Sequence, residues 1–299
     1  MPEMPMEKVR VCIPSLLSIA RDAGTAILEV YRSDFAVEHK EDRSPLTHAD
    51  RRSHEIIVKG LTGLEGMHIP VLSEEGKNIP FEERRGWELF WLVDPLDGTK
   101  EFVKRNGEFT VNIAFMSHGR PLAGVIYIPL KDVFYFAAEG LGSFRLDTSD
   151  PLSSGLLDVI IKGSVTLPIT NDQSPIRRVP SRLTVIGSRS HMSSETEQFI
   201  NSLRAEHGEV DLISAGSSLK FCLIAEGKAD VYPRFAPTME WDTGAGQAIV
   251  EQAGGKVVRA DAGGPLIYNK QNLLNPWFIA TSCGFSSLGY KALESSVAS

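Results

Sequence analysis

Residues 89–102, LFWLVDPLDGTKEF, hold the pattern from which the rest of the chain can be interpreted. A run of large apolar residues ends at Asp94, and a second carboxylate follows at Asp97. Such a run, bounded by turn residues, predicts a buried strand that stops at Asp94. Gly98 then permits a tight turn and lets the backbone approach an anion. Thr99 is expected to open a helix, whose free N–H groups attract phosphate.

Two further acidic sites repeat this design. Glu74 follows a short strand predicted in HIPVLS, and Asp242 follows Trp241 at the expected N-cap of a helix. Each site alone has an ordinary explanation, because Asp is common in turns and at helix N-caps. Together, however, buried carboxylates repel one another unless a cation cancels their charge, and Mg²⁺ prefers oxygen ligands. The pattern predicts a phosphate held between metal ions and helix N-termini, the second of these at DTGAG, residues 242–246.

Other phosphate chemistries fit the sequence less well. It contains neither a P-loop consensus, GxxxxGK followed by Ser or Thr, nor the GxSxG of serine hydrolases. Phosphatases of the haloacid-dehalogenase type use Asp-x-Asp, whereas the spacing here is Asp-x-x-Asp. These differences favour direct attack on phosphorus by water that a metal ion has activated.

The composition describes an acidic globular protein. Of the 299 residues 42% are hydrophobic, and the formal net charge is -7, which argues against a nucleic acid polymer as partner. The odd number of cysteines and the absence of a CxxC pair predict reduced thiols. No signal peptide and no apolar run of the roughly 20 residues that cross a bilayer is evident. Cytoplasm is the expected location, and peripheral association with the inner membrane stays open.

The first half of the chain reads as helices followed by a sheet. A helix is expected over residues 6–32, regular only after Pro14, and a second helix within residues 37–61. Residues 109–146 read as an antiparallel meander, because β-rich runs alternate with Gly, Pro and polar pairs. Residues 147–180 are expected to be irregular and to hold a domain boundary.

The second half alternates helix and strand, as α/β layers do. Three helices are expected to stop at Gly208, at Gly227 and at the Gly254–Gly255 pair. We therefore expect an N-terminal α+β domain over residues 1–150, which binds metal, and a C-terminal α/β domain over residues 151–299, which sets substrate specificity.

Three motifs resemble the signatures of the inositol monophosphatase superfamily: SEE at 73–75, DPLDGT at 94–99 and WDTGAG at 241–246. Within it, five longer segments resemble the CysQ-type 3'(2'),5'-bisphosphate nucleotidases. These are DPLDGTKEF at 94–102, SRSH at 188–191, GSSLKFCLIAEG at 216–227, YPRFAPTMEWDT at 232–243 and LLNPWF at 273–278. Residues 147–180 and the Met239–Glu240 pair depart from that pattern.

The resemblance implies a layered α-β-α-β-α sandwich of the inositol monophosphatase and fructose-1,6-bisphosphatase type. It also implies a Mg²⁺-dependent, Li⁺-sensitive phosphatase with two or three ions. The implied metal ligands are Glu74, Asp94, Asp97, Asp242 and the Leu96 carbonyl. The implied catalytic residues are Asp50, Glu74 and Thr99, of which Asp50 and Thr99 position and deprotonate the attacking water. The implied substrate contacts are Gly98, Thr99, Ser188, His191, Ser217, Lys220 and Asp242.

For three basic side chains a role outside ligand binding stays open. Lys220 falls in the first turn of a helix after Ser217, a candidate cap, where the helix dipole disfavours a cation; it either binds an anion or is solvated at the surface. His191 is either a ligand contact or a loop residue, and Arg234 either faces the site or forms a structural ion pair.

The preferred function is hydrolysis of adenosine 3',5'-bisphosphate to AMP and phosphate, with its sulfated analogue as a second substrate. An inositol or sugar monophosphatase on the same fold is the first alternative. A catalytically silent, nucleotide-binding regulator is the second.

Overall fold

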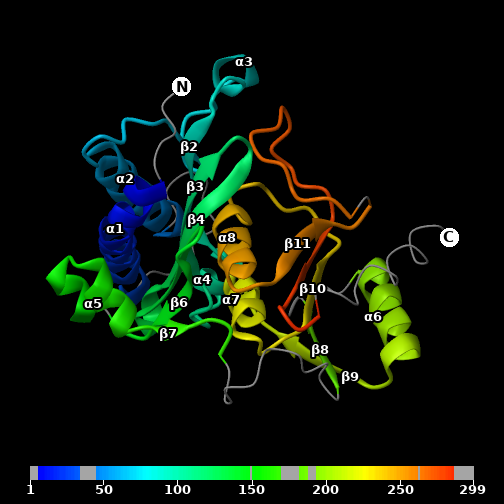
Figure 1. Ribbon diagram of the computed structural model, residues 1–299. Coiled ribbons are helices and arrows are strands. Elements are labelled where there is room, and N and C mark those ends of the chain that lie inside the picture. Colours follow the sequence, from blue (N-terminus) through cyan, green and yellow to red (C-terminus); the bar gives the residue numbers. More distant parts are fainter. Residues whose placement is uncertain are drawn as a thin grey trace.

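The computed structural model describes residues 6–33, 45–148, 150–169, 182–187, 193–261 and 263–285. Five layers follow one another across the molecule, in the order helices, sheet, helices, sheet, helix (Figure 1). The expected α-β-α-β-α sandwich is therefore confirmed. The outer helices on the first sheet are α1 (Met6–Arg32), α2 (Pro45–Thr62) and α5 (Leu157–Lys162). Between the sheets lie α7 (Leu219–Glu226) and α8 (Gly244–Gln252), and α6 (Ser194–His207) covers the second sheet.

The first sheet has seven strands in sequence order. Its first strand runs parallel to the second, and every later neighbour pair is antiparallel, so the expected meander is confirmed. The strands are β1 (Val71–Ser73), β2 (Leu89–Asp97), β3 (Thr110–Ser117), β4 (Arg120–Ile128), β5 (Val133–Ala138), β6 (Gly142–Leu146) and β7 (Val165–Thr166). Short helices interrupt them: α3 (Phe81–Arg84), α4 (Thr99–Val103), η1 (Pro129–Lys131) and η2 (Asp150–Ser154).

The second sheet has five strands in the order β11-β12-β10-β8-β9. Strand β8 is parallel to both β9 and β10, whereas β12 is antiparallel to β10 and β11. The strands are β8 (Leu183–Gly187), β9 (Val210–Ser214), β10 (Val231–Arg234), β11 (Lys256–Arg259) and β12 (Phe278–Thr281). Helices and strands alternate along this half, as the sequence predicts, and Gly208 and Gly227 follow the ends of α6 and α7.

Strand β2 is buried on both faces, which explains its continuous apolar sequence. Trp91 and Val93 belong to the core that α1 and α2 form with one face of the sheet. Phe90 and Leu92 belong to the core on the opposite face, with residues of α7 and α8. The first sheet therefore has a hydrophobic core on each side, and packing on both faces fixes the position of the strand ends.

The helix expected over residues 6–32 is confirmed as α1, but it is already helical before Pro14, because buried residues on either side of the proline, Ile13 and Leu16, pack in the same core. One expected element boundary is wrong. Strand β2 continues past Asp94 to Asp97, which pairs with Thr110 after a register shift. A bulge of this kind accommodates a proline, which has no N–H to donate to the sheet.

The expectation of irregular structure after residue 147 is also wrong in part. Residues 150–166 form η2, α5 and β7, and β7 adds to the edge of the first sheet. The short apolar repeat of α5 buries Ile160, which the many polar residues around it obscure in the sequence. The first sheet thus extends beyond residue 150, and the division into domains at that residue stays a prediction.

Candidate active site

Three carboxylates from separate segments meet at one end of the first sheet. Because β1 and β2 are parallel and Ser73 lies opposite Val93, the next residues, Glu74 and Asp94, come out side by side. The Glu74 amide donates to the Val93 carbonyl at 3.1 Å and fixes this register. Asp242 arrives from the turn before α8. Carboxylate oxygens of Glu74, Asp94 and Asp242 lie within 4.8 Å of one another, so the sequence prediction that these acids converge is confirmed.

No ion pair with a described residue balances the negative charge of this group. Asp94 is 1% exposed, and its burial, with Asp97 and Glu74 nearby, raises its pKa well above the usual range. Burial and the neighbouring Asp97 raise the pKa of Asp242 to about 7. Across the described residues, no Lys, Arg or His side chain forms an ion pair with Glu74, Asp94 or Asp242. A divalent cation would remove this repulsion.

The remaining acidic residues lie close by. Asp50, on α2, is buried, and its Oδ1 has no hydrogen-bond partner among the residues described. Burial, and then Glu75 and Glu74, raise the pKa of Asp50 to about 8. Asp97 accepts a hydrogen bond at 2.7 Å from Ser218 rather than joining the group of three. A carboxylate with an unpartnered buried oxygen is suited to take a proton.

The turn after β2 has the geometry that its sequence predicts. Gly98 has φ 91°, and a Cβ there would lie 2.9 Å from both the Glu108 carbonyl and the Ser217 side chain. Only glycine fits both the conformation and the space. Helix α4 begins at Thr99, as expected, and Thr99 is exposed at the cavity described next. Leu96 is buried, and its amide donates to Asp94 Oδ1 at 3.1 Å.

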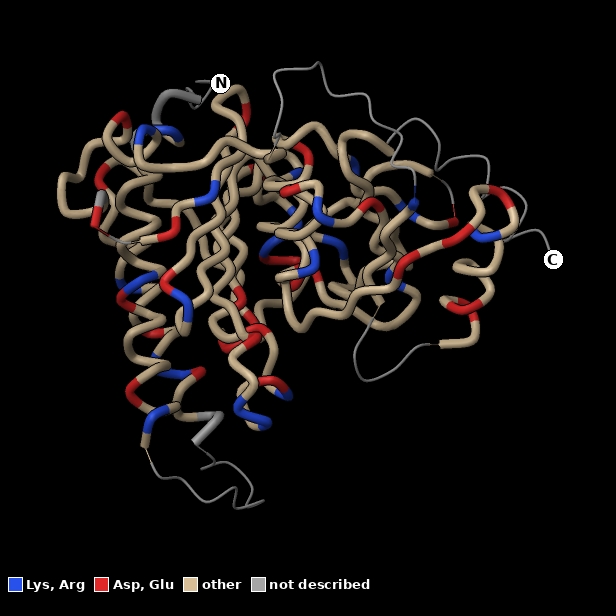
Figure 2. Tube along the Cα trace, turned by 90° about the horizontal axis from the view of Figure 1, so that it is seen from below, with Lys and Arg blue, Asp and Glu red and all other residues tan. Residues whose placement is uncertain are grey.

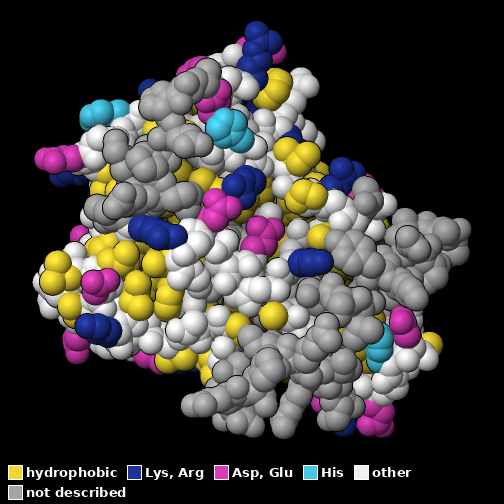
Figure 3. All heavy atoms as spheres, in the orientation of Figure 1, with side chains coloured by type: hydrophobic (Ala, Val, Ile, Leu, Met, Phe, Trp, Pro, Cys, Tyr) yellow, Lys and Arg dark blue, Asp and Glu magenta, His cyan; other side chains and the backbone are white. Residues whose placement is uncertain are grey.

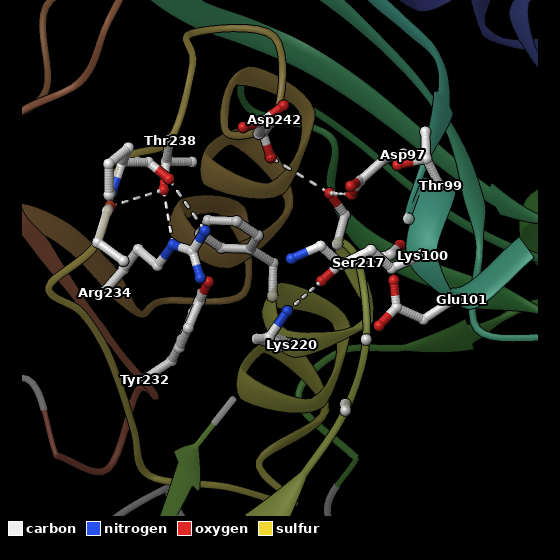
Figure 4. Close-up of a pocket in the computed structure, with 17 residues that line it drawn as sticks. Asp97, Thr99, Lys100, Glu101, Ser217, Lys220, Tyr232, Arg234, Thr238 and Asp242 are labelled. Atoms are coloured by element: carbon white, nitrogen blue, oxygen red, sulfur yellow. Dashed lines mark hydrogen bonds between the residues drawn. The ribbon is translucent and has the colours of Figure 1, made fainter. Parts of the chain in front are cut away.

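A cavity of about 370 Å³ opens beside the carboxylates. In Figure 4, Asp242 and Asp97 lie toward one side of it, and Lys220 and Arg234 lie across from them. Gly98, Thr99 and Ser217 also line this cavity. The first half of the chain and the second therefore contribute to one hollow, in which Asp97 and Asp242 lie opposite Lys220 and Arg234.

The Lys220 side chain is buried at the cationic end. It is 7% exposed; its Nζ donates to the Ser217 carbonyl at 2.9 Å and lies 5.6 Å from the centre of the Tyr232 ring. Burial lowers its pKa, and Asp97 opposes that shift. The alternative of a solvated surface lysine is therefore wrong. An ammonium group held by a neutral carbonyl and an aromatic ring retains capacity for an anion.

Arg234 is also oriented by neutral groups. Its Nε donates to Thr238 Oγ1 at 2.6 Å, and its Nη2 donates to the Pro237 carbonyl at 3.0 Å. Within the described ranges, no carboxylate lies at ion-pair distance from it, so the structural ion pair considered as an alternative is not found there. Its guanidinium lines the same cavity as Lys220.

Two expected helix caps are displaced by one residue. Ser218, not Ser217, precedes α7, and Ser217 has φ 49° in the turn before it. Thr243, not Asp242, precedes α8, because the Asp242 carboxylate accepts the Met239 amide at 2.8 Å and closes the preceding turn. In each case the helix begins later because a polar side chain is used by the site or its turn.

Ser188 and His191 lie outside the described residues, so their expected roles stay predictions.

Three polar residues of the site escape the sequence analysis. Thr110 and Asn112, on β3, and Ser218 are buried. Asn112 forms hydrogen bonds with both Thr110 and Ser218, and Ser218 donates to Asp97. The signal that could reveal them is the pair of polar residues two apart in TVN, inside an otherwise apolar strand. Residues two apart share one face of a strand, so both side chains point the same way.

The Met239–Glu240 pair, which departs from the expected pattern, holds the turn of Asp242. The Glu240 carboxylate is fully buried and accepts the amides of Asn269, at 2.6 Å, and Lys270, at 3.1 Å. It also pairs with the Lys270 ammonium at 2.5 Å. Its carbonyl accepts the Thr243 amide at 3.1 Å. This glutamate therefore anchors the turn of Asp242 to the segment before β12.

The glycines of DTGAG have a packing role. A Cβ at Gly246 would lie 2.4 Å from Phe221 of α7, and one at Gly244 would lie 2.9 Å from Leu92 of β2. On the facing strand, a Cβ at Gly124 would lie 2.5 Å from the Ala245 carbonyl. Helix α8 is pressed between the first sheet and α7, and its small residues permit this approach.

Charge elsewhere on the molecule is mixed. Acidic and basic residues are interspersed along the chain trace (Figure 2). On the described part of the face shown in Figure 3, Lys and Arg side chains stand apart from one another, several of them next to acidic ones. Among the described helices, none is both long and apolar enough to cross a membrane.

Comparison with known proteins agrees with this geometry. The inositol monophosphatase family model matches residues 10–283. The 3'(2'),5'-bisphosphate nucleotidase CysQ of Escherichia coli K12 is 43% identical over 269 residues, 89% of this chain and 98% of that protein. The same nucleotidase of Salmonella typhimurium is 43% identical over 90% of this chain and 99% of the relative.

Solved structures give the same answer. The crystal structure of CysQ from Bacteroides thetaiotaomicron superposes with a TM-score of 0.81, at 48% identity, over 90% of this chain and 96% of that one. An inositol monophosphatase from Zymomonas mobilis, 20% identical, shares the fold with a TM-score of 0.70 over 99% of both chains. Sequence, fold and the converging carboxylates thus agree, and the chain belongs to the inositol monophosphatase family.

Proposed function

We propose that this chain is a Mg²⁺-dependent 3'(2'),5'-bisphosphate nucleotidase that converts adenosine 3',5'-bisphosphate to AMP and phosphate. The observation that carries the proposal is the cavity that Asp242, one of the three converging carboxylates, and Asp97 line opposite the buried Lys220. A substrate with one phosphate would use only the acidic end, whereas a substrate with two would use both. The similarity to CysQ nucleotidases supports the same choice.

The donor set fits a hard divalent cation. Carboxylate oxygens are the ligands that Mg²⁺ prefers, and Asp94 and Asp242 are poorly solvated acids without a cationic partner among the described residues. We assign Glu74, Asp94, Asp97, Asp242 and the Leu96 carbonyl to two or three ions. Bound Mg²⁺ would neutralise charge on the phosphate and lower the pKa of water.

The chain's own residues would orient and deprotonate the attacking water. Asp50 Oδ1 has an unused lone pair in a buried setting, so it is the group that we expect to accept the proton, assisted by Glu74. The Thr99 hydroxyl, exposed at the cavity, would orient that water. The amides of Gly98 and Thr99 would hold the phosphate that is removed.

The second phosphate would lie at the cationic end. Lys220 offers an ammonium group directed by the Ser217 carbonyl, and Ser217 belongs to the same turn. We assign the nucleoside to this side as well, with Ser188 and His191 as further contacts. The cytoplasmic location stays a prediction, and so does the absence of a nucleic acid polymer among its partners.

A substrate panel with Mg²⁺ tests the proposal by measuring phosphate release. We expect the highest kcat/KM for adenosine 3',5'-bisphosphate or its sulfated analogue, and a lower value for inositol 1-phosphate and sugar phosphates. A preference for inositol 1-phosphate would replace the proposal with an inositol monophosphatase. Nucleotide binding with Mg²⁺ but without turnover of any substrate would indicate a regulator instead.

A further inference from the structure

A chain of buried hydrogen bonds connects the floor of the cavity to Asp97. Ser217 and Thr110 share a hydrogen bond between their hydroxyls at 2.8 Å, and Thr110 Oγ1 lies 3.0 Å from Asn112 Oδ1. Asn112 Nδ2 lies 2.9 Å from Ser218 Oγ, which in turn lies 2.7 Å from Asp97 Oδ2. Asn112 Nδ2 also reaches Asp97 Oδ2 directly, at 3.4 Å. One amide side chain therefore stands at the centre of a path between strand β3, the start of α7 and a carboxylate of the site.

The donor and acceptor roles along this path are determined by chemistry. The carboxylate of Asp97 accepts hydrogen bonds, so the part of Asn112 nearest to it is the NH₂ group. The other end of that amide is then a carbonyl oxygen, and Thr110 must donate its hydroxyl proton to it. The Thr110 oxygen is left to accept the proton of Ser217. A flipped amide would put two acceptors face to face at Asp97, and its carbonyl oxygen would compete with Asp97 for the one proton of Ser218.

The path also restrains the Asp97 carboxylate. Ser218 accepts from Asn112 and has one proton to give, which goes to Asp97 Oδ2 at 2.7 Å rather than to the Asp242 carbonyl at 3.2 Å. Both donors bind the same oxygen, so the other oxygen of Asp97 is left to face the site. Thr110, Asn112 and Ser218 are 0%, 1% and 2% exposed, so water does not readily replace a lost partner.

We propose that Asn112 is a positioning residue that holds Asp97 in its metal-binding orientation and ties it to the turn that carries Lys220. This inference rests on the proposed function, since it takes Asp97 as a metal ligand. The same turn supplies the Ser217 carbonyl to the Lys220 ammonium. Asn112 thus couples the acidic end of the cavity to the cationic end, although its side chain touches neither the substrate nor the reacting atoms.

The decisive measurement is metal affinity of the substrate-free protein. Asn112→Ala and Ser218→Ala are compared with Ser143→Ala, which removes a buried hydroxyl from β6 of the same sheet that has no hydrogen-bond partner among the described residues. Mn²⁺ binding to chelator-treated protein is measured by calorimetry, together with melting temperature and the Mg²⁺ concentration for half-maximal activity.

Loss of an outer partner of a metal ligand typically costs about 10- to 100-fold in affinity. We therefore expect Asn112→Ala to weaken Mn²⁺ binding about tenfold or more, with a parallel rise in the Mg²⁺ requirement, while Ser143→Ala changes neither. The double variant Asn112→Ala/Ser218→Ala should lose less Mn²⁺ affinity than the two single losses combined, because Asn112 also orients the Ser218 hydroxyl that donates to Asp97. If Asn112→Ala does not fold, Asn112→Ser is expected to fold and to show the same loss.

Mn²⁺ affinity within twofold of the unaltered protein, in a folded Asn112 variant, would overturn the proposal even if that variant melts at a lower temperature. Fully additive losses in the double variant would overturn the coupling of Asn112 to the turn through Ser218, since Asn112 would then act on Asp97 by its direct contact alone. The calorimetry requires no substrate. Failure of the proposed nucleotidase activity would therefore appear in the substrate panel and leave this measurement unaffected.

Discussion

The two ends of the cavity carry opposite charges, and different kinds of side chain hold these charges in place. At the acidic end, short side chains such as Asp94 extend directly from strands and turns that the first sheet holds rigid. At the cationic end, the long side chains of Lys220 and Arg234 are oriented by carbonyl and hydroxyl oxygens. Neither end pairs with an opposite charge from the described protein.

This difference indicates what each end requires. Short buried carboxylates have no freedom to separate, so their repulsion is relieved by a proton or by a cation. A buried ammonium group that donates to a neutral carbonyl has a hydrogen-bond partner, but no negative charge balances its positive one. In the proposed function a metal ion and a phosphate would supply the two missing charges, and a ligand with two phosphates would complete the site.

The largest effect is expected from a change at the acidic end. Asp94→Asn removes a charged metal ligand, and we expect kcat/KM to fall by more than about 100-fold, beyond the usual loss for an outer partner. The metal-free variant should melt at a higher temperature, because one of the repelling charges is gone. Phosphate release and thermal unfolding measure both.

Asp242→Asn should behave in the same way, whereas Asp158→Asn, an exposed aspartate on α5, serves as the control. Activity of Asp94→Asn or Asp242→Asn within tenfold of the unaltered enzyme would remove the basis for the metal site.

A change at the cationic end should be smaller and selective. Lys220→Met keeps the apolar stem but loses the ammonium group. Hydrogen bonds to charged groups contribute about 1.5–3 kcal/mol, which corresponds to a roughly 10- to 100-fold loss in kcat/KM for adenosine 3',5'-bisphosphate. Inositol 1-phosphate, which has no second phosphate, should lose much less.

Lys162→Met, at an exposed lysine of α5, is the matched control. Equal losses for the two substrates in Lys220→Met would show that Lys220 does not recognise the second phosphate.

The smallest effect concerns stability and pH. The unfolded chain releases its aspartate protons near pH ~4, whereas the folded, metal-free protein has a pKa of about 7 for Asp242 and about 8 for Asp50. The folded state binds more protons between these limits, so its free energy of unfolding should fall as pH rises from about 5 to about 8.

Mg²⁺ should reverse this trend at pH ~8, since a ligand at 100 times its dissociation constant adds about 2.7 kcal/mol. Melting temperatures with chelator and with Mg²⁺, measured across this range, provide the test. A metal-free protein whose stability rises toward pH ~8 would contradict the assignment of raised pKa values to these aspartates.

The same comparison separates what the sequence predicts from what it does not. The acidic end can be predicted because Glu74 and Asp94 come at the ends of apolar runs and Asp242 comes at the small-residue start of a helix, so all three can be placed at element ends without knowing the fold. The layers can also be predicted, because the spacing of apolar residues indicates helices and strands and glycines mark where helices end.

The cationic end and the hydrogen bonds that connect the two ends are harder to predict from the sequence. The burial of Lys220 depends on how α7 packs between the sheets, and Asn112 acquires its partners only when β3 and the start of α7, about 100 residues later, come together. The regular helix before Pro14 and the continuation of β2 to Asp97 depend on tertiary packing, which outweighs the local preference of proline.

The close contact of α8 with α7 has a consequence for which ligands fit. Asp242 lies just before α8 and Lys220 lies in the first turn of α7, while Gly246 leaves no room for a Cβ against Phe221. The packing of the two helices thus sets the distance between Asp242 and Lys220, and Gly246 permits their close contact. A larger residue at position 246 would push the helices apart, increase that distance and change which spacing between two phosphates fits the site.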